Sequence, residues 1–237
     1  MIPLLHSELL KLRTIRTFLW LALVTALLTA ITAASVAASE DSIQSASDDR
    51  AVAQIAGTAI VIALISGIIV MAGESTHGTI TQTLLVTPIR ERVLIAKSLV
   101  AALLGLVLAV IAEALVLGIT VPGAGLDAHN ARYALLGVLI AAPLAGVLGA
   151  GFGAIVGSQG AAIGISLVWL LIGENVMPVI SHEGAKYVPG RVFAALASGD
   201  RHGSELIVGM GAGAVAAAIW TAAFAAAGVL TLLGRDV

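Results

Sequence analysis

The sequence predicts an all-α integral membrane protein with six transmembrane helices, on the grounds of its composition and of its apolar runs. Of the 237 residues, 59% are hydrophobic and 11% are charged, and the mean hydropathy is +1.07. A soluble domain carries roughly a quarter charged residues, so this composition fits a lipid bilayer as solvent. Six apolar runs each reach the roughly 20 residues that a spanning helix needs, and none alternates like a barrel strand.

These runs must be helical because lipid offers no hydrogen-bond partner to an exposed backbone. The first run is longer than the roughly 7–15 apolar residues of a signal peptide, and Glu8 precedes it, which favours an uncleaved span. We predict a single transmembrane domain over residues 1–237, with spans at residues 18–38, 52–72, 93–119, 133–156, 161–180 and 206–233.

Residues 1–16 precede the first span and have the pattern of an amphipathic helix. Leu5, Leu9 and Leu12 share one face, and Lys11 lies on the opposite face. Such a helix lies along a membrane surface with its cations toward anionic lipid. Two interpretations stay open: a basic leader that fixes orientation, and an interfacial helix that contacts a partner.

The cations of the loops predict the orientation of the chain. With the N-terminus inside, seven cations are cytoplasmic: Lys11, Arg13, Arg16, Arg90, Arg92, Lys97 and Arg235. Five are then external: Arg50, Arg132, Lys186, Arg191 and Arg201. An excess of cations marks cytoplasmic loops, so we expect both termini in the cytoplasm.

Between the second and third spans the sequence is polar and contains two helix breakers. Gly78 interrupts the helix of the second span, and residues 79–86 can form a short surface helix. Pro88 ends that helix, and Thr87 is suited to cap the next one. We expect three cations to hold the start of the third span at the headgroups: Arg90, Arg92 and Lys97.

This segment resembles the signature E-x-x-x-G-T…L-L-x-T-P-x-x-R…K of the ABC type-2 permeases, the membrane subunits of bacterial ATP-driven exporters. The matching residues are Glu74, Gly78, Thr79, Leu84, Leu85, Thr87, Pro88, Arg90 and Lys97. Residues 7–12 are similar to the start of that family, and the six spans agree with it. The resemblance implies that residues 1–16 are the elbow helix and 79–86 the coupling helix, and that 181–206 form extracellular helices.

The resemblance further implies a permease subunit of an ABC exporter in the bacterial plasma (inner) membrane. Two copies of a separate ATPase subunit would bind ATP and Mg, and a second permease subunit, identical or homologous, would complete the path. The residues that would couple to the ATPase are Glu74, Gly78, Thr79, Leu84, Thr87, Pro88 and Arg90. The exported substrate and the choice between homodimer and heterodimer stay open.

We expect no catalytic, cofactor or metal site in this chain itself. The sequence lacks a G-x-x-x-x-G-K-[ST] phosphate loop, and its five histidines lack the spacing of a metal site. The net charge of −2 gives no reason to expect a nucleic-acid partner, whereas membrane lipids are expected ones. The chain is therefore expected not to be an enzyme.

Two acids fall within predicted spans. A carboxylate at that depth costs about 2.5–3.5 kcal/mol, so Glu113 and Glu174 should face protein or water. One interpretation places them, with Asn175, on the translocation path. The other is a structural carboxyl group that is hydrogen-bonded to a neighbouring helix or lies near the membrane surface.

Glycines repeat through the fourth span and into the fifth: Gly149, Gly153, Gly157, Gly160 and Gly164. Small residues at this spacing predict close helix–helix contacts. Two rival functions remain beside an ABC permease: a secondary transporter, and a membrane immunity protein that binds a partner without transport. Co-purification with an ATPase separates the first function from both rivals, and a requirement for an ion gradient would favour the secondary transporter.

Overall fold

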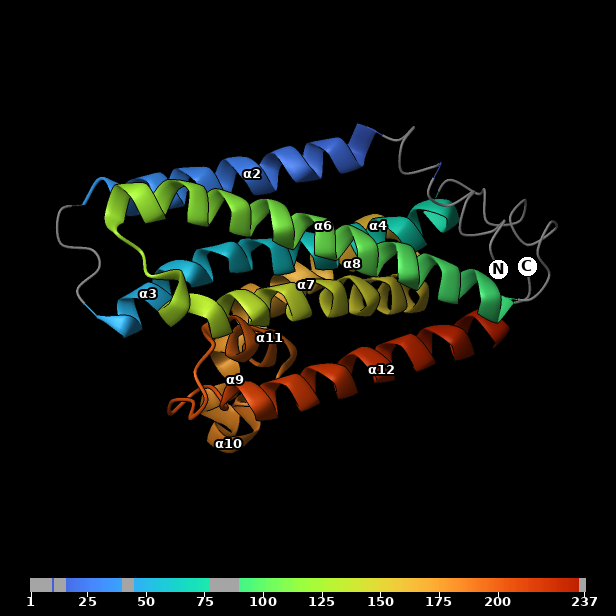
Figure 1. Cartoon of the computed structure of the whole chain (residues 1–237). Coiled ribbons are helices and arrows are strands. Elements are labelled where there is room, and N and C mark those ends of the chain that lie inside the picture. The colour runs from blue at the N-terminus through green and yellow to red at the C-terminus, as the bar shows by residue number, and fades with distance from the viewer. Residues whose placement is uncertain (1–9, 11–15, 40–44, 77–89, 235–237) are drawn as a thin grey trace.

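The computed structural model describes Leu10 and residues 16–39, 45–76 and 90–234. Throughout these residues the elements are helices, and the part of the chain described contains no strand (Figure 1). Six helical segments are long and apolar enough to cross a membrane, which confirms the predicted fold class. The predicted short helix at 79–86 lies outside the described residues, as do residues 1–16 except Leu10 and Arg16.

The first and second spans are α2 (Arg16–Ala37) and a run of α3 (Ala46–Ala53), the 3-10 turn η1 (Gln54–Gly57) and α4 (Thr58–Thr76). The third and fourth are α6 (Arg90–Ala124) and α7 (Ala128–Val156). The fifth joins α8 (Gln159–Val168), the π-helical turn η2 (Trp169–Gly173) and α9 (Glu174–Ile180). The short α10 (His182–Ala185) and α11 (Pro189–Ser198) precede the sixth span, α12 (Met210–Gly234).

The last helix begins at Met210, whereas its apolar run begins near residue 206. The intervening chain closes a tight turn, in which Ser204 N donates to Ile207 O at 2.7 Å and Gly203 pairs with Val208. Hydropathy places the start of the span too early because Leu206, Ile207 and Val208 are apolar although they belong to this turn.

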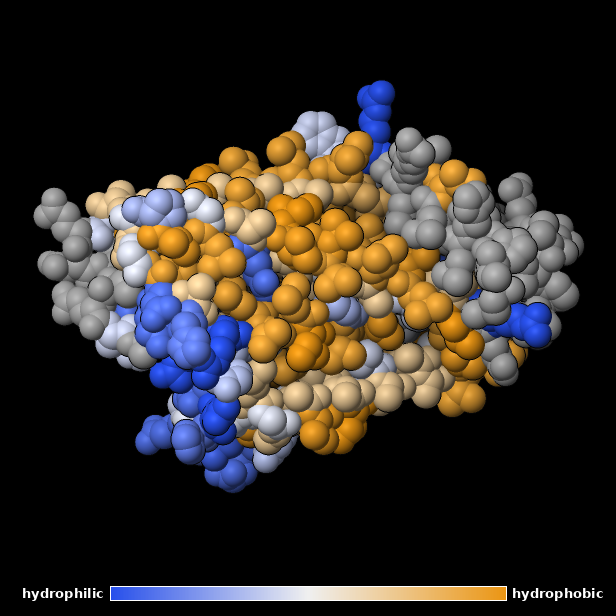
Figure 2. Space-filling view, in the orientation of Figure 1, coloured by the Kyte–Doolittle hydropathy of each residue, from blue (hydrophilic) through white to orange (hydrophobic). Residues whose placement is uncertain are grey.

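The two ends of the bundle differ in what they carry. The first turns of α2 and α6 and the last turns of α4 and α12 lie at one end, here called the α4–α6 end (Figure 1). The short helices α3, α10 and α11 lie at the opposite end, the α3–α11 end. Figure 2 shows a hydrophobic surface between the ends and a gathering of hydrophilic residues at the α3–α11 end. This distribution fits a bundle that crosses a bilayer.

Helix α7 is the central helix and packs against α4, α6, α11 and α12. It approaches each of them through a different glycine, where an added Cβ would lie 1.8–2.5 Å from a carbonyl oxygen of the neighbour. The pairs are Gly137 with Leu196 of α11, Gly146 with Ala101 of α6, Gly149 with Leu64 of α4, and Gly151 with Phe224 of α12. Lipid tails are as apolar as the side chains, so the hydrophobic effect does not drive helices together within a bilayer. Close backbone packing of this kind holds them together instead.

The glycine repeat therefore predicts some contacts correctly and others wrongly. Gly149 and Gly153 face α4, as expected. Gly157 instead ends α7 in the left-handed conformation, with φ of 73°. At Gly160 and Gly164 an added Cβ would meet nothing within 4 Å, so no described helix covers this face of α8. For these last two glycines the prediction of close contact within the chain is wrong.

At the α3–α11 end a buried acid joins α3 to the start of α7. Asp49 is 3% exposed, and its two carboxylate oxygens accept hydrogen bonds from Asp127 N and Asn130 Nδ2, both at 2.9 Å. The Asp127 side chain in turn caps α7 by accepting from His129 N at 2.8 Å. Buried acceptors must be paired, so these bonds fix where the loop between α6 and α7 crosses the end of the bundle.

Replacement of Gly149 by Val should destabilise the bundle. The new side chain would force α7 away from Leu64 of α4, and overpacking of this kind costs about 1–3 kcal/mol. Thermal unfolding of the detergent-purified protein is the measurement, and we expect a lower midpoint for Gly149→Val. The control Gly164→Val adds the same atoms where space is open and should unfold like the unmodified protein. Equal losses in both variants would contradict the packing described for α7.

Candidate functional site

The described signature residues Glu74, Arg90 and Lys97 belong to α4 and α6, the two helices that flank residues 77–89. Glu74 lies in the last turn of α4, and Arg90 is the first residue of α6. The remaining predicted coupling residues lie outside the described residues: Gly78, Thr79, Leu84, Thr87 and Pro88. The structure therefore describes the contacts of α4 and α6, the two helices that flank residues 77–89.

The end of α4 is hydrogen-bonded to the start of α8. Thr76 Oγ1 donates to Ala72 O at 2.9 Å and accepts from Gln159 N at 3.0 Å. Gln159 is the first residue of α8, so its amide is one of those that a helix leaves unpaired. The Thr76 hydroxyl satisfies this amide from another helix. The Thr76–Gln159 hydrogen bond thus connects the last turn of α4 to the start of the fifth span.

Lys97 links α6 to α4 and does not extend to the headgroups, as the sequence suggested for it. Its side chain is 1% exposed, and Nζ donates to Val70 O of α4 at 3.3 Å. Arg92, by contrast, is exposed. The difference arises because position 97 faces α4, and a buried ammonium group must find acceptors inside the protein. The two helices that enter and leave residues 77–89 are therefore connected to each other.

A second candidate site is a hollow of about 330 Å³ near the α3–α11 end. It lies among η1, α4, α7, η2, α9 and α11, and apolar side chains form most of its wall, among them Ile60, Leu148, Leu170 and Phe193. Glu174 is the one charged residue in its lining, and Gln54 adds an amide. A mostly apolar hollow with few polar groups is the common form of a small-molecule site.

Glu174 also joins the fifth span to α11. It is 7% exposed, and Oε1 accepts from Gly190 N at 2.5 Å. Gly190 lies in the first turn of α11, where unpaired amides favour a carboxylate. An added Cβ at Gly190 would lie 2.5 Å from Glu174 Oε2, so a larger residue here would require the Glu174 carboxylate to shift. Arg191 Nη2 donates to the backbone oxygen of Glu174 at 3.1 Å and reinforces the junction.

The structure does not bring the three predicted path residues together. Asn175 is exposed and donates from Nδ2 to Leu171 O of its own helix at 2.8 Å. Glu113 is 8% exposed in α6, which supplies no residue to the hollow, and its buried Oε1 has no hydrogen-bond partner among the described residues. Of the three, Glu174 alone lines the hollow.

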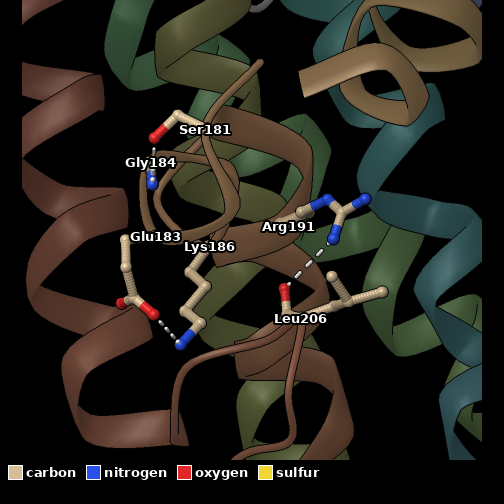
Figure 3. A network of polar contacts seen from close by, with 6 residues as sticks. All are labelled: Ser181, Glu183, Gly184, Lys186, Arg191 and Leu206. Carbon is tan, nitrogen blue, oxygen red and sulfur yellow. Dashed lines mark hydrogen bonds and ion pairs between the residues drawn. The ribbon is translucent and has the colours of Figure 1, made fainter. Parts of the chain in front are cut away.

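Short polar contacts order the chain between the fifth and sixth spans (Figure 3). Ser181 caps α10 by accepting from Gly184 N at 3.1 Å, and Lys186 Nζ contacts Glu183 Oε1 at 2.9 Å. The hydrogen bond from Lys186, together with its positive charge, lowers the pKa of Glu183. Arg191 Nη1 donates to Leu206 O at 3.2 Å, which joins α11 to the loop before α12. The predicted 181–206 region thus contains two helices, α10 and α11.

Sequence reasoning missed Thr76, Gln159 and Gly190, although each contributes to a junction between helices. Thr76 and Gln159 are polar residues at the ends of apolar runs, which is a weak signal because any loop supplies such residues. Gly190 follows Pro189 and looks like an ordinary turn residue. No group of three His, Cys, Asp or Glu residues that could hold a metal ion occurs within the described ranges.

Comparison with known proteins places the chain in a family. A family model described as ABC-2 family transporter protein matches residues 4–180, which include the first five spans and the segment between α4 and α6. No curated protein matches the chain. The match covers well over half of the sequence. It agrees with the six apolar helices of the described residues and with the position of the end of α4 and the start of α6 at the same end of the bundle. The chain belongs to the ABC-2 family of transporter permeases.

Proposed function

We propose that this protein is the membrane-spanning permease subunit of an ABC exporter, driven by ATP hydrolysis in a separate subunit. The observation that carries the proposal is the family match, which spans the signature residues and the two helices that flank them. Because the sequence lacks a phosphate loop, the proposal assigns ATP and Mg to two copies of a partner ATPase. A second permease subunit, identical or homologous, would complete the complex in a bacterial inner membrane.

In this proposal the ATPase acts on residues 77–89, and the junctions of the α4–α6 end distribute the movement. The Thr76–Gln159 bond would carry a displacement of α4 to α8 and so to the fifth span. The Lys97–Val70 bond would make α4 and α6 move together. Closely packed helices shift as rigid bodies, and this favours a change between two arrangements of the bundle over local bending.

The hollow beside Glu174 is our candidate for part of the export path. Its apolar wall and single carboxylate suit an amphipathic substrate that carries a cationic group. Glu174 contacts the first turn of α11, so movement of the fifth span would change the hollow and the position of α11 together. Glu113 and Asn175 lie outside the hollow and have no part in this proposal.

The proposed orientation predicts which residues are accessible from each side of the cell membrane. The chain contains no cysteine, so single cysteines can be labelled selectively with a membrane-impermeant maleimide. Thr79→Cys should react in inside-out vesicles and not in intact cells. Glu183→Cys, at a position whose side chain is 79% exposed at the opposite end, should react in intact cells. Labelling of Thr79→Cys from outside intact cells would reverse the orientation and remove the basis for coupling.

Changes in the signature should uncouple ATP hydrolysis from movement of the bundle. The complex would be purified from membranes through this subunit, with a reporter cysteine at Ala194, which is exposed and lines the hollow. Addition of ATP and Mg should alter the labelling rate of the reporter in the unmodified complex. Gly78→Pro or Arg90→Glu should remove this response while the subunit stays in the membrane and the ATPase still hydrolyses ATP.

Arg92→Glu is the matched control, because it reverses a charge on the same helix outside the signature and should keep the response. Two results would defeat the proposal: no ATPase in the purified complex, or an unchanged ATP response in both signature variants. Cargo movement by the isolated subunit, driven by a proton or sodium gradient, would instead identify a secondary transporter.

A further inference from the structure

A cluster of cationic side chains surrounds a second hollow, of about 350 Å³, at the α3–α11 end. Three arginines and two histidines line it: Arg50, Arg132, Arg201, His129 and His202. Asp200 is the one acid in the lining. The arginines come from α3, from α7 and from the loop after α11, so the cluster exists only in the folded protein.

The backbone holds these groups in place. Gly199 ends α11 in the left-handed conformation, with φ of +63°, and an added Cβ would lie 2.3 Å from Ala134 N of α7. The loop therefore passes directly over the start of α7. Met210 N donates to Asp200 O at 2.7 Å and closes the loop behind Arg201. Short loops with internal hydrogen bonds keep their side chains in defined positions, and this preorganises a binding site.

Two of the arginines share one aromatic ring. The guanidinium carbons of Arg132 and Arg201 lie 4.8 and 4.5 Å from the centroid of the Tyr133 ring. Arg201 Nη2 also donates to the Tyr133 hydroxyl, and Arg132 Nη1 contacts the ring nitrogens of His129. These contacts orient the two guanidinium groups without neutralising their charge, because each is to an aromatic ring, a hydroxyl or an imidazole.

Two acids lie at or near the hollow, Asp49 and Asp200, and both accept hydrogen bonds from N–H groups of the protein. Both carboxylate oxygens of Asp49 accept hydrogen bonds from the start of α7, and Asp200 Oδ1 accepts from His202 N at 3.1 Å. Across the described ranges no carboxylate forms an ion pair with Arg132 or Arg201. Like charges held together repel one another, and a bound anion relieves that repulsion.

We propose that this hollow is a binding site for a phosphate-bearing anion. Guanidinium groups present paired N–H donors that match phosphate oxygens, and a charge-assisted pair is the strongest form of such a contact. The volume lies within the range of ordinary small-ligand sites, which is roughly 300–1,000 Å³. The phosphate group could belong to a soluble anion or to a lipid headgroup. The hydrophobic surface that begins beside this end of the bundle brings lipid headgroups near the hollow, and the exposed side chains of Arg132 and Arg201 are open to a soluble anion (Figure 2).

The first arm of the test uses pyrophosphate as the soluble probe. Its binding to the full-length protein in detergent is measured by titration calorimetry near physiological ionic strength. Arg132→Gln and Arg201→Gln should each weaken binding about tenfold, the loss expected for one charge-assisted hydrogen bond. Lys186→Gln removes the same charge at the same end of the bundle but outside the hollow, and should bind like the unmodified protein.

The second arm tests a lipid source in nanodiscs of phosphatidylcholine with or without phosphatidylglycerol. Native mass spectrometry counts the phosphatidylglycerol that stays with the protein after release from the disc. Retention that is lost in the Arg132→Gln/Arg201→Gln double variant and kept in Lys186→Gln would assign the site to lipid. Pyrophosphate binding with the same variant pattern would assign it to a soluble phosphate.

Arg132 and Arg201 are exposed, so their replacement should leave the fold intact, which an unchanged unfolding midpoint would verify. Tyr133→Phe keeps the ring and should retain most of the affinity, whereas Tyr133→Leu should lose it. If neither probe binds, or if the double variant binds both as well as the Lys186→Gln control, the proposal is wrong. This test uses no ATPase, so its outcome is independent of the proposed export function.

Discussion

Close approach of backbones around α7 is the constraint on which the rest of the structure depends. In a bilayer, apolar side chains gain little by leaving lipid for protein, so helices associate through dense packing. Helix α7 meets its four main neighbours at glycines, where no side chain separates one helix from the carbonyl oxygens of the next. Gly146 and Gly149 place α6 and α4 on it, and Gly137 and Gly151 place α11 and α12. The polar junctions at both ends exist because these contacts fix the helices in register.

The two ends of this closely packed bundle differ in the groups that they carry. Among the described residues at the α4–α6 end, two hydrogen bonds join the flanks of residues 77–89 to neighbouring helices. The α3–α11 end carries two hollows, one with a mostly apolar wall and one lined by charged groups, and Glu174 joins α11 to the fifth span beside the first. Force applied at one end of a closely packed bundle moves whole helices, so it can reach the other end without a continuous chain of polar contacts.

Lys97 and Glu174 show which features of a side chain's environment the local sequence predicts and which it does not. Lys97 resembles a headgroup anchor in sequence, because it follows two arginines at the start of a span, but it is buried against Val70 of α4. Glu174 was correctly expected to face protein or water, since an unpaired carboxylate in lipid is too costly. Its partner, Gly190, is sixteen positions away in sequence, and no local pattern indicates that the two meet.

The sequence by itself determined the solvent, the number of spans and the family, because lipid requires long apolar helices and the signature is contiguous in the chain. Only the tertiary structure decided which glycines face a neighbour, as the difference between Gly149 and Gly164 shows. It also brought Arg132 and Arg201 together over Tyr133. The physical reason is that such contacts depend on the rotation and depth of each helix in the membrane. Packing between segments far apart in the chain sets both, so the hydropathy of any one segment does not predict them.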